Sequence, residues 1–329
     1  MIFIYFFGKM IAFSFGYQPN SVMRCSVLIV NWNTRELLRE CLESLESLRL
    51  REDCEVIVVD NASSDQSVEM VRRVFPDVKL LPQSANTGFA EGNNIAFRAS
   101  SGELIMLLNP DTRVKPGAIE VLMGFLETHE DAGAVAGKFL NPDGSFQRYY
   151  NRFPTIRAIL LTHFPVFQSR VLTHRAVREY FMLDDDFSQP RTVDQPAAAG
   201  LLVRRDGIAQ DPFFMDPQFR IFFSDVDLAH RIWFRGKKIY YIPDAEIVHH
   251  HGGGGLNLLK KTDRFSIEYA VAFVRYLKKY RGWVVAMAVK GVLLSGMLVD
   301  ALRFMARPSS DFKQRSLARK RVWKFLKSH

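Results

Sequence analysis

Three apolar runs in the first third of the chain each end abruptly in polar residues. The runs span residues 26–30, 56–59 and 104–108, and the polar residues that follow them include Trp32, Asp60 and Asp111. Apolar runs rich in β-branched residues are typical of parallel strands that are buried on both faces. Ligands of open α/β sheets bind outside the carboxyl ends of the strands. We therefore predict that these three side chains meet at one edge of one sheet.

Segments of helical periodicity alternate with these runs. Apolar residues recur at helical spacing over 37–48, after Thr34 as the expected N-cap, and Ser64 and Asp65 are placed to cap a second helix that Pro76 closes. Further patterns predict a strand at 78–81, a helix at 90–99, a helix opened by Pro116 and a strand at 134–140. This alternation predicts an α/β fold with a doubly wound, mostly parallel sheet.

The second half of the chain is less regular. Residues 145–195 show no clean period, so we expect a variable insert or a lid over the site at the sheet edge. Regular patterning returns at 197–205, and 237–242 is expected to be a strand. An aromatic run precedes Asp225 and Asp227, and an amphipathic helix is expected after them.

Length and composition are those of an ordinary globular protein. The chain has 329 residues, 48% hydrophobic and 24% charged, which is enough for one large domain with an appendage or for two modest domains. Its three cysteines have no metal-ligand spacing, which argues against a disulfide framework or a zinc site. We therefore expect a reducing, cytosolic environment.

The positive charge lies mainly in the C-terminal tail. The net charge is +9, and residues 301–329 carry nine basic side chains against one acid, Asp311. The preceding stretch, 283–305, is apolar but is interrupted by Lys290 and Asp300, so it is borderline for a helix that spans a membrane. An interfacial helix followed by a polybasic segment fits better, and it favours an anionic membrane surface over nucleic acid as a partner. A helix packed on the main domain with a solvated basic end is the alternative.

The first residues are apolar and aromatic, with Lys9 in their middle and no evident cleavage site, unlike a signal peptide. An upstream translation start before Met23 explains them as well as a function does. We therefore divide the chain into an N-terminal extension (1–23), a main domain (24–255) and a helical, amphipathic and polybasic C-terminal region (256–329).

The polar residues at the predicted sheet edge have ordinary and functional interpretations. Asp111 could hold Mg²⁺ or Mn²⁺ and through it a diphosphate, although Asn-Pro-Asp is also common turn material. Asp60 could accept a hydrogen bond from a pyrimidine or a ribose, or cap the next helix. Trp32 could stack on a base or pack in the core. Their shared location favours a nucleotide and metal site.

Two further clusters carry candidate chemistry. The positive end of a helix dipole keeps a carboxylate ionised, so Asp225 could act as general base toward a sugar hydroxyl while Asp227 caps the helix; capping alone is the alternative. Consecutive histidines of a strand point to alternating faces, so His249 and His251 would share one side and His250 the other. One of these imidazoles could complete the metal shell or contact a diphosphate, but three adjacent ligands cannot reach one metal.

Taken in order, these segments resemble family 2 glycosyltransferases with the GT-A fold, in the bacterial rhamnosyltransferase-like branch. The matching segments are SVLIVNWN, VIVVDNASSD, NTGFAEGNN, LIMLLNPD, AAAGLLVRR, FFMDPQF, SDVDLAHR and HHHGG. The resemblance implies a GT-A type sheet with a helical, membrane-associated appendage. The Gln-x-x-Arg-Trp motif of processive synthases is absent, so we expect one sugar per encounter.

The resemblance also implies a role for each matching residue. Asp225 would be the catalytic base, Asp111 would coordinate Mg²⁺ or Mn²⁺, and His250 best matches the histidine near the metal and diphosphate. The residues implied in substrate binding are Trp32, Asn33, Asp60, Asn86, Gly88, Phe89, Asn94, Asp216, Asp227 and Arg231. Two positions depart from the family pattern: Ser224 replaces the glutamate before the base, and the Asp-x-Asp motif is reduced to its last aspartate, Asp111.

The implied function is an inverting, metal-dependent, non-processive glycosyltransferase. Its donor would be a nucleotide sugar, foremost dTDP-L-rhamnose, and its acceptor a polyprenyl-diphosphate-linked or other glycan at the cytoplasmic face of the inner membrane. An inactive sugar-nucleotide-binding relative that scaffolds glycan assembly is the alternative, on the strength of Ser224. A nucleotidyltransferase would need a glycine-rich basic loop after the first strand. Residues 31–34 do not form such a loop, which argues against that function.

Overall fold

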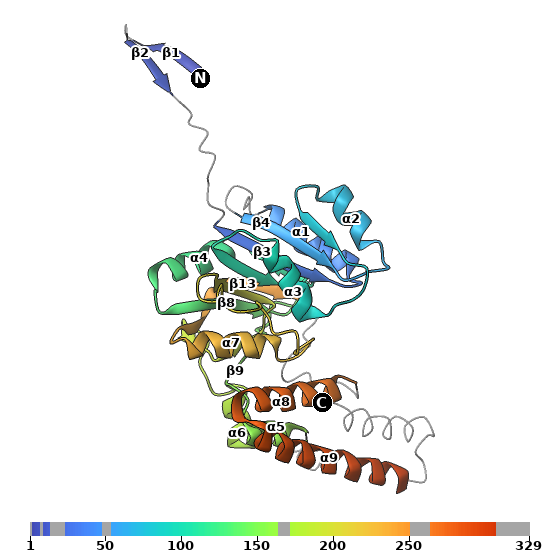
Figure 1. The fold of residues 1–329 in the computed structure, drawn as a ribbon. Coiled ribbons are helices and arrows are strands. Elements are labelled where there is room, and N and C mark those ends of the chain that lie inside the picture. The colour runs from blue at the N-terminus through green and yellow to red at the C-terminus, as the bar shows by residue number, and fades with distance from the viewer. Residues whose placement is uncertain are drawn as a thin grey trace.

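A large sheet forms the centre of the protein, as the computed structural model in Figure 1 shows. The structure describes residues 2–6, 9–13, 24–47, 54–163, 172–250 and 264–306. The nine strands of the sheet run in the order β10-β13-β8-β12-β6-β3-β4-β5, and β7 pairs with β13 beside this path. Their bounds are β3 (Cys25–Asn31), β4 (Cys54–Asp60), β5 (Lys79–Pro82), β6 (Leu104–Leu108), β7 (Thr112–Val114), β8 (Ala132–Leu140), β10 (Arg191–Thr192), β12 (Gly200–Arg204) and β13 (Lys238–His249).

The first half of the sheet is parallel, as the sequence predicts. Strand β3 pairs in parallel with both β4 and β6, and β4 pairs in parallel with β5. Asn31 lies opposite Asp60, and Ile29 lies opposite Leu108. The carboxyl ends of these strands therefore meet at one edge, and the polar residues that follow them are brought together.

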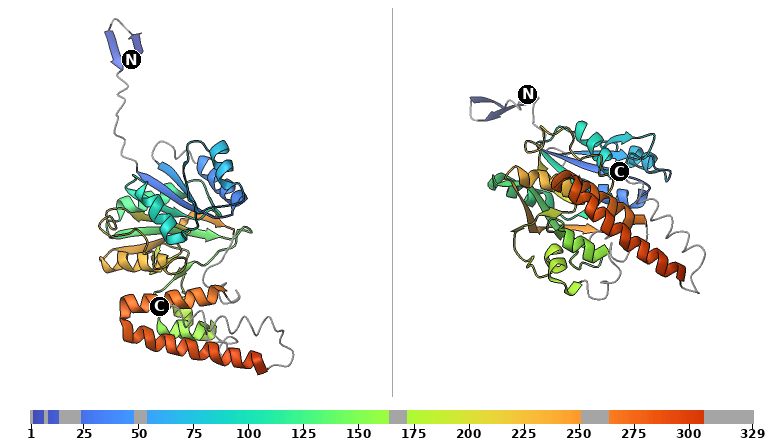
Figure 2. Two further views of the ribbon diagram at one scale, coloured as in Figure 1. Left: turned by 45° about the vertical axis from the view of Figure 1, so that its right-hand side comes forward. Right: turned by 60° about the horizontal axis from the view of Figure 1, so that its bottom comes forward.

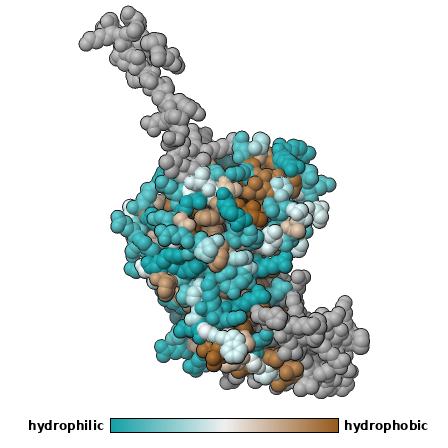
Figure 3. All heavy atoms as spheres, viewed as in Figure 1, coloured by the Kyte–Doolittle hydropathy of each residue, from teal (hydrophilic) through white to brown (hydrophobic). Residues whose placement is uncertain are grey.

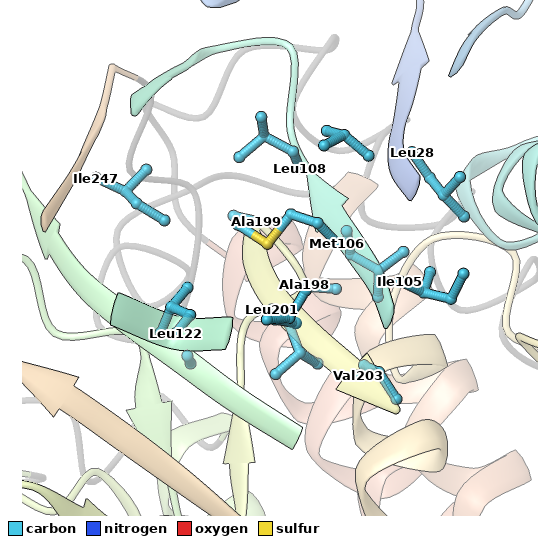
Figure 4. Packing of buried hydrophobic residues seen from close by; sticks show 14 of the residues in the cluster. Leu28, Ile105, Met106, Leu108, Leu122, Ala198, Ala199, Leu201, Val203 and Ile247 are labelled. Atoms are coloured by element: carbon cyan, nitrogen blue, oxygen red, sulfur yellow. The ribbon is translucent and has the colours of Figure 1, made fainter. Parts of the chain in front are cut away.

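The second half of the sheet is mixed. Strand β12 is antiparallel to both β6 and β8, whereas β13 is parallel to β8 and antiparallel to β7 and β10. Because β12 runs against β6, its first residue, Gly200, lies opposite the last, Leu108. The start of β12 therefore belongs to the same edge as the ends of β3, β4 and β6. Figure 4 shows Ala198 and Ala199, just before β12, among the buried side chains of β6 and β12.

Helices cover both faces of this sheet. Helix α3 contacts β3 and β4, α1 contacts β7 and α2, and both α4 and α7 contact β8 and β13. Their bounds are α1 (Arg35–Ser47), α2 (Ser67–Val74), α3 (Phe89–Arg98), α4 (Ala118–Thr128) and α7 (Ser224–Phe234). The alternation predicted from the sequence is confirmed for the first four of these helices and for the helix after Asp225.

Helix α1 begins directly after Thr34, as predicted, and the Thr34 carbonyl accepts from the N–H of Leu38 at 2.8 Å. The Thr34 hydroxyl donates to the carboxamide oxygen of Asn31 at 2.6 Å. The N–H of Arg35 instead donates to Asp65 Oδ2 at 2.9 Å, and Oδ1 of the same carboxylate accepts from the N–H of Ser67 at 3.1 Å. Asp65 thus serves the starts of two helices, and this arrangement joins the loops that follow β3 and β4.

A second layer of helices lies below the sheet (Figures 1 and 2). It comprises α5 (Ile156–His163), α6 (Arg175–Tyr180), α8 (Arg264–Arg281) and α9 (Trp283–Ala306). Apolar side chains of all four helices form one buried cluster with Phe219, Phe223 and Val226, at the entrance to α7. Within the described part of 145–195, α5 and α6 thus pack with the C-terminal helices, whereas β10 joins the main sheet. The proposed role of this segment as a lid stays a prediction.

Short elements complete the described part of the chain. Strands β9 (Tyr150–Asn151) and β11 (Gln195–Pro196) form one two-stranded sheet, and β1 (Ile2–Phe6) and β2 (Lys9–Phe13) form another. The three cysteines are buried free thiols. Within the described ranges, no helix has the length and apolar character needed to cross a membrane.

Candidate active site

Trp32 lies at the sheet edge with its side chain largely exposed. Its exposed fraction is 55%, which rules out the alternative that it packs in the core. The following residue, Asn33, has a left-handed backbone (φ 54°), and its carboxamide oxygen accepts from the N–H of Ser64 at 2.7 Å. This contact fixes the loop after β3 against the loop after β4 and presents the Trp32 ring to solvent.

Asp60 is buried at the end of β4. Its Oδ2 accepts from the side-chain amide of Asn31 at 2.8 Å, and its Oδ1 accepts from the N–H of Ser63 at 2.8 Å. Helix α2 begins only at Ser67, so the carboxylate does not cap it. The structure thus gives Asp60 an organising role between two strand ends, and its contact with a base stays a prediction.

The loop before α3 is held against a segment that is distant in sequence. Asn86 Oδ1 accepts from the N–H of Gly88 at 2.9 Å, and the Asn86 carbonyl accepts from Arg220 Nη2 at 2.9 Å. The Arg220 carbonyl in turn accepts from the N–H of Phe89 at 3.0 Å. Gly88 has φ +91°, and a Cβ there would lie 2.5 Å from Arg220 Cγ, so glycine suits this contact.

The side chain of Asn94 bonds to the backbone of Met215. Its Oδ1 accepts from the Met215 N–H at 2.7 Å, and its Nδ2 donates to the Met215 carbonyl at 2.8 Å. Because the Asn94 side chain is buried and its amide is used in this way, it positions the segment that carries Asp216. The sequence implies Asn94 for pocket shape, but it does not reveal Met215 as its partner.

Asp111 follows β6 and faces the end of β13. Its Oδ1 lies 3.3 Å from His249 Nε2, and its carbonyl accepts from the N–H of His250 at 2.9 Å. The other ring nitrogen of His249, Nδ1, lies 2.9 Å from Gln147 Oε1. His249 is therefore buried between a carboxylate and an amide, which hold its ring at this edge.

The structure brings His249 rather than His250 beside Asp111. The reason is the pairing of β7 with β13, which places His249 opposite Thr112. His250 Nε2 instead lies 3.5 Å from Glu40 Oε2 on α1. The alternation of the histidines predicts that the two face opposite ways, but not which one meets Asp111. His251 lies outside the described residues.

The donor groups at Asp111 fit a divalent cation that a substrate helps to hold. Asp111 and His249 offer a carboxylate oxygen and an imidazole nitrogen, whereas the described residues contain no group of three or more histidine, cysteine or acidic side chains placed to hold a metal ion. Mg²⁺ and Mn²⁺ sites commonly use one or two carboxylates, with water and phosphate oxygens completing the shell. The protein ligands present suit that arrangement.

Asp225 lies in the first turn of α7 and is partly exposed. Burial raises the pKa of its carboxyl, although the N–H groups of Val226, Asp225 and Ala198 oppose the shift. The helix end is expected to favour the ionised carboxylate, but the pKa is shifted in the opposite direction, because desolvation outweighs the nearby donors. A carboxylate with a raised pKa is a stronger base.

The small-residue segment before β12 connects the two acidic positions. The N–H of Asn109, two residues before Asp111, donates to the Ala199 carbonyl at 3.2 Å. The N–H of the neighbouring residue, Ala198, acts on the Asp225 carboxyl and opposes the rise in its pKa. The turn that carries Asp111 and the carboxyl of Asp225 therefore both lie near residues 198–199.

Asp227 is the centre of a buried polar network. It is 0% exposed, and its oxygens accept from Lys279 Nζ at 2.5 Å, Tyr280 Oη at 2.6 Å and Arg231 Nε at 3.0 Å. Lys279 also bonds to Asp216 Oδ2 at 2.8 Å. The expected capping by Asp227 is wrong, because Lys279, Tyr280 and Arg231 take its oxygens, and the first-turn N–H of Val226 donates to Asp225 Oδ1 at 2.9 Å instead. Asp227 instead connects α7 to α8, and Arg231 ties α7 to Asp211 and to the Phe214 carbonyl. The contact of Asp227 and Arg231 with substrate stays a prediction.

Ser224 occupies the position of the family glutamate. Its side chain is buried, and its hydroxyl has no hydrogen-bond partner among the described residues. A buried polar atom without a partner is unfavourable in a folded protein. Serine in place of the family glutamate therefore leaves a destabilising, unpartnered hydroxyl next to the candidate base.

Comparison with known proteins agrees with this architecture. Residues 26–204 match the family model of glycosyl transferase family 2. Over 237 residues the chain is 29% identical to the N-acetylglucosaminyl-diphospho-decaprenol L-rhamnosyltransferase of Mycobacterium tuberculosis, which covers 68% of this chain and 75% of that protein. It is also 30% identical over 128 residues to the glycosyltransferase GlyG of Streptococcus pneumoniae, which covers 38% of this chain and 42% of the relative.

Solved structures share the fold at low sequence identity. The structure of S. aureus TarS 1-349 matches with a TM-score of 0.52 at 14% identity, over 93% of this chain and 72% of the other. GalNAc-T7 with UDP, GalNAc and Mn²⁺ matches with a TM-score of 0.56 at 14% identity, over 93% of this chain and 56% of the other. The sheet thus has the GT-A-like arrangement that the sequence predicts. The match to the family model covers more than half of the chain, and the chain therefore belongs to the family 2 glycosyltransferases.

Proposed function

We propose that this glycosyltransferase is inverting and non-processive, and that it moves L-rhamnose from dTDP-L-rhamnose to a polyprenyl-diphosphate-linked acceptor. The M. tuberculosis relative, whose name states a rhamnosyl transfer to a diphospho-decaprenol acceptor, supports the sugar and the acceptor class. The observation that carries the mechanism is that the turn of Asp111 and the carboxyl of Asp225 both lie near residues 198–199, since the Asn109 N–H bonds to Ala199 and the Ala198 N–H acts on Asp225.

The donor would bind across the ends of β3, β4 and β5. The exposed ring of Trp32 is available to stack on the base, and the buried Asp60 is held between the ends of β3 and β4. The loop of Asn86 and Gly88 borders the same edge, and its contacts with Arg220 hold its shape. Stacking would supply affinity, and polar groups of these loops would supply selectivity for the nucleotide.

A divalent cation would lie at Asp111, with an imidazole of His249 or His250 beside it. Mg²⁺ or Mn²⁺ bound there supplies positive charge against the charge that develops on the departing diphosphate. His249 is the nearer imidazole, and its contact with Gln147 fixes the orientation of the ring. We assign the first metal ligand to Asp111, and we keep both histidines as candidates for the second.

Asp225 would activate the acceptor. Its carboxylate takes the proton of an acceptor hydroxyl, and the oxygen forms a bond to the anomeric carbon from the face opposite the diphosphate. The bond from that carbon to the diphosphate breaks, and its electron pair leaves with the nucleoside diphosphate. The anomeric configuration is therefore inverted, and the proton remains on Asp225. The raised pKa of Asp225 suits it to this task.

The place of action follows from the acceptor. An acceptor carried on a polyprenyl diphosphate is held in a membrane, so the enzyme would work at the membrane surface. We assign it to the cytoplasmic face of the inner membrane as a peripheral protein. The nine basic residues of 301–329 support this, because polybasic segments are attracted to anionic leaflets.

Donor hydrolysis and transfer by the purified full chain test the proposal. A panel of sugar nucleotides would be supplied with Mn²⁺ or Mg²⁺ and a lipid-linked acceptor, beside Asp225→Asn. The matched control is Asp244→Asn, which removes an exposed carboxylate on β13. We expect metal-dependent release of dTDP from dTDP-L-rhamnose, lost in Asp225→Asn and kept in Asp244→Asn.

Other results would change the assignment. If the enzyme turns over a different donor, the assigned sugar changes but the assigned enzyme class does not. Failure of every donor, with thermal stabilisation by one nucleotide, would favour the inactive binding relative, for which the unpartnered Ser224 hydroxyl is the structural support.

A further inference from the structure

Helix α9 is apolar on more than one side. One side packs into the lower layer, where Ala286, Val289 and Leu293 are buried against α8 and its neighbours. This spacing of three and four residues is that of a single helical face. An ordinary surface helix would carry polar side chains on the opposite face.

The opposite face of α9 is also apolar. Five large apolar side chains of this helix are exposed: Trp283 (63%), Val284 (74%), Val292 (43%), Leu298 (44%) and Val299 (46%). Between them, Ala288, Gly291 and Ser295 are exposed at the same helical spacing. We call the residues Val284, Ala288, Gly291, Val292, Ser295 and Val299 the outer stripe. It contains no charged residue, and hydrophobic side chains appear along the lower edge in Figure 3, where α9 lies.

Basic residues precede and follow the outer stripe along the chain. Lys278 and Arg281 are exposed at the end of α8, directly before α9. At the other end, the sequence from Arg303 onward carries the nine basic residues of the tail. An apolar helix face bordered by basic residues matches a bilayer surface, which offers acyl chains beneath anionic headgroups.

We propose that the outer stripe of α9 docks on an anionic lipid surface, with the helix lying in the plane of the interface. This inference rests on the proposed function in one respect, since a lipid-linked acceptor places the enzyme at a membrane. A second copy of the chain fits the same face less well. Both ends of the stripe are basic, so two stripes packed in either direction would bring like charges together.

Docking through α9 would be transmitted to the active edge by packed elements. Helix α8 leads directly into α9 and carries Lys279 and Tyr280, which both bond to Asp227. Asp227 is on α7, two residues from Asp225. Helix α8 therefore joins the docking helix to α7, which carries the candidate base, and would hold the active edge at a defined orientation to the bilayer.

Vesicle co-sedimentation of the full chain tests the docking. The vesicles would be phosphatidylcholine alone or phosphatidylcholine with phosphatidylglycerol. The test variant is Val292→Glu with Val299→Glu. The matched control is Val74→Glu with Val121→Glu, which adds the same charges at valines that are each 38% exposed on α2 and α4. We expect the test variant to lose about tenfold or more in affinity for anionic vesicles, and the control to bind as the wild type does.

Trp283 offers a second readout that needs no added charge. Its fluorescence should shift to the blue on anionic vesicles, and the shift should be reduced in Trp283→Phe. Absence of wild-type binding to the anionic vesicles would overturn the proposal. Equal binding by the test variant would also overturn it, as would a wild-type dimer that the test variant dissociates while vesicle binding is unchanged.

Donor hydrolysis without vesicles separates this proposal from the proposed function. If the protein hydrolyses donor but does not bind vesicles, the docking proposal is contradicted and the proposed enzyme activity is supported. If the protein turns over no donor but binds vesicles in a way that depends on the outer stripe, the docking proposal is supported and the proposed function is contradicted. The test variant should hydrolyse donor at the wild-type rate, because the stripe lies outside the candidate active site.

Discussion

At Asp225, burial and backbone N–H groups act on one carboxyl in opposite directions, and burial prevails. Catalysis requires the ionised form, so kcat/KM should fall as the pH falls through the raised pKa. The acid limb of the profile should therefore lie above about 3.9, the value of a free aspartate. A profile of kcat/KM against pH measures it, with Asp244→Asn expected to keep the same limb. A limb at or below about pH 4 would argue against Asp225 as the base.

The same pKa shift predicts the stability of Asp225→Asn. A carboxyl whose pKa is raised in the folded protein binds its proton more tightly there than in the unfolded chain, so it lowers stability as the pH rises through the folded pKa. At neutral pH the variant should thus be inactive and yet at least as stable as the wild type. Thermal unfolding at pH 7 measures this, and a clear loss of stability would instead assign Asp225 a structural role.

Trp32 should matter for binding but not for folding. Stacking of an aromatic side chain on a base is worth about 1–3 kcal/mol, so Trp32→Ala should weaken nucleotide binding by roughly 5- to 150-fold. Its Tm should be unchanged because the side chain is 55% exposed. Calorimetric titration with the nucleoside diphosphate measures the affinity, and Trp32→Phe should keep part of it. Unchanged affinity in Trp32→Ala would remove this residue from the donor site.

At the scale of elements, Lys279 connects α8 to α7 and to the segment of Asp216. Removal of its charge leaves Asp227 and Asp216 short of a partner inside the protein, although Tyr280 and Arg231 still bond to Asp227. Lys279→Met should therefore lower the free energy of unfolding by about 2–4 kcal/mol. Denaturant unfolding measures it, with the adjacent exposed Lys278→Met as control. Equal effects of the two substitutions would contradict a structural role of this network.

The contact between the loop before α3 and Arg220 depends on Gly88. Gly88→Ala would place a Cβ at φ +91°, within 2.5 Å of Arg220 Cγ and 3.1 Å of its carbonyl oxygen. Gly144→Ala is the matched control, since that glycine also has a positive φ (+83°) but has no other atom within 4 Å of its Cβ position. Backbone strain of about 1–3 kcal/mol is common to both variants. Gly88→Ala should lose more stability than Gly144→Ala, and it should weaken donor binding. Equal losses of stability in the two variants would contradict a role of the Arg220 contact.

At the scale of the whole molecule, ligand and metal should stabilise the fold together. A nucleoside diphosphate at about 100 times its Kd adds about 2.7 kcal/mol to the free energy of unfolding. If Asp111 and a cation hold the diphosphate, the rise in Tm should need Mn²⁺ or Mg²⁺ and should be lost on addition of EDTA. Asp111→Asn should abolish the metal-dependent part, and Asp244→Asn should keep it. A full rise in Tm in EDTA would contradict metal-assisted binding.

The sequence by itself determined the strands, most helices and the edge at which the polar residues gather. The periodic spacing of apolar residues and the abrupt ends of the strands are local signals in the sequence. Parallel pairing of the strands then places Trp32, Asp60 and Asp111 at one edge. The motifs further indicated the family, which the family model confirms. These features could be read because each depends on neighbours within a few residues along the chain.

Tertiary structure alone decided which side chains meet. The pairing of β7 with β13 selects His249 for Asp111, and the antiparallel entry of β12 brings Ala198 to Asp225. Lys279 reaches Asp227 across 52 positions of sequence. The physical reason is that a buried charge or amide takes whichever partner packing places within hydrogen-bond distance, and such partners lie on different elements. Local patterns name the polar residues, and only the packed fold determines their partners and their pKa values.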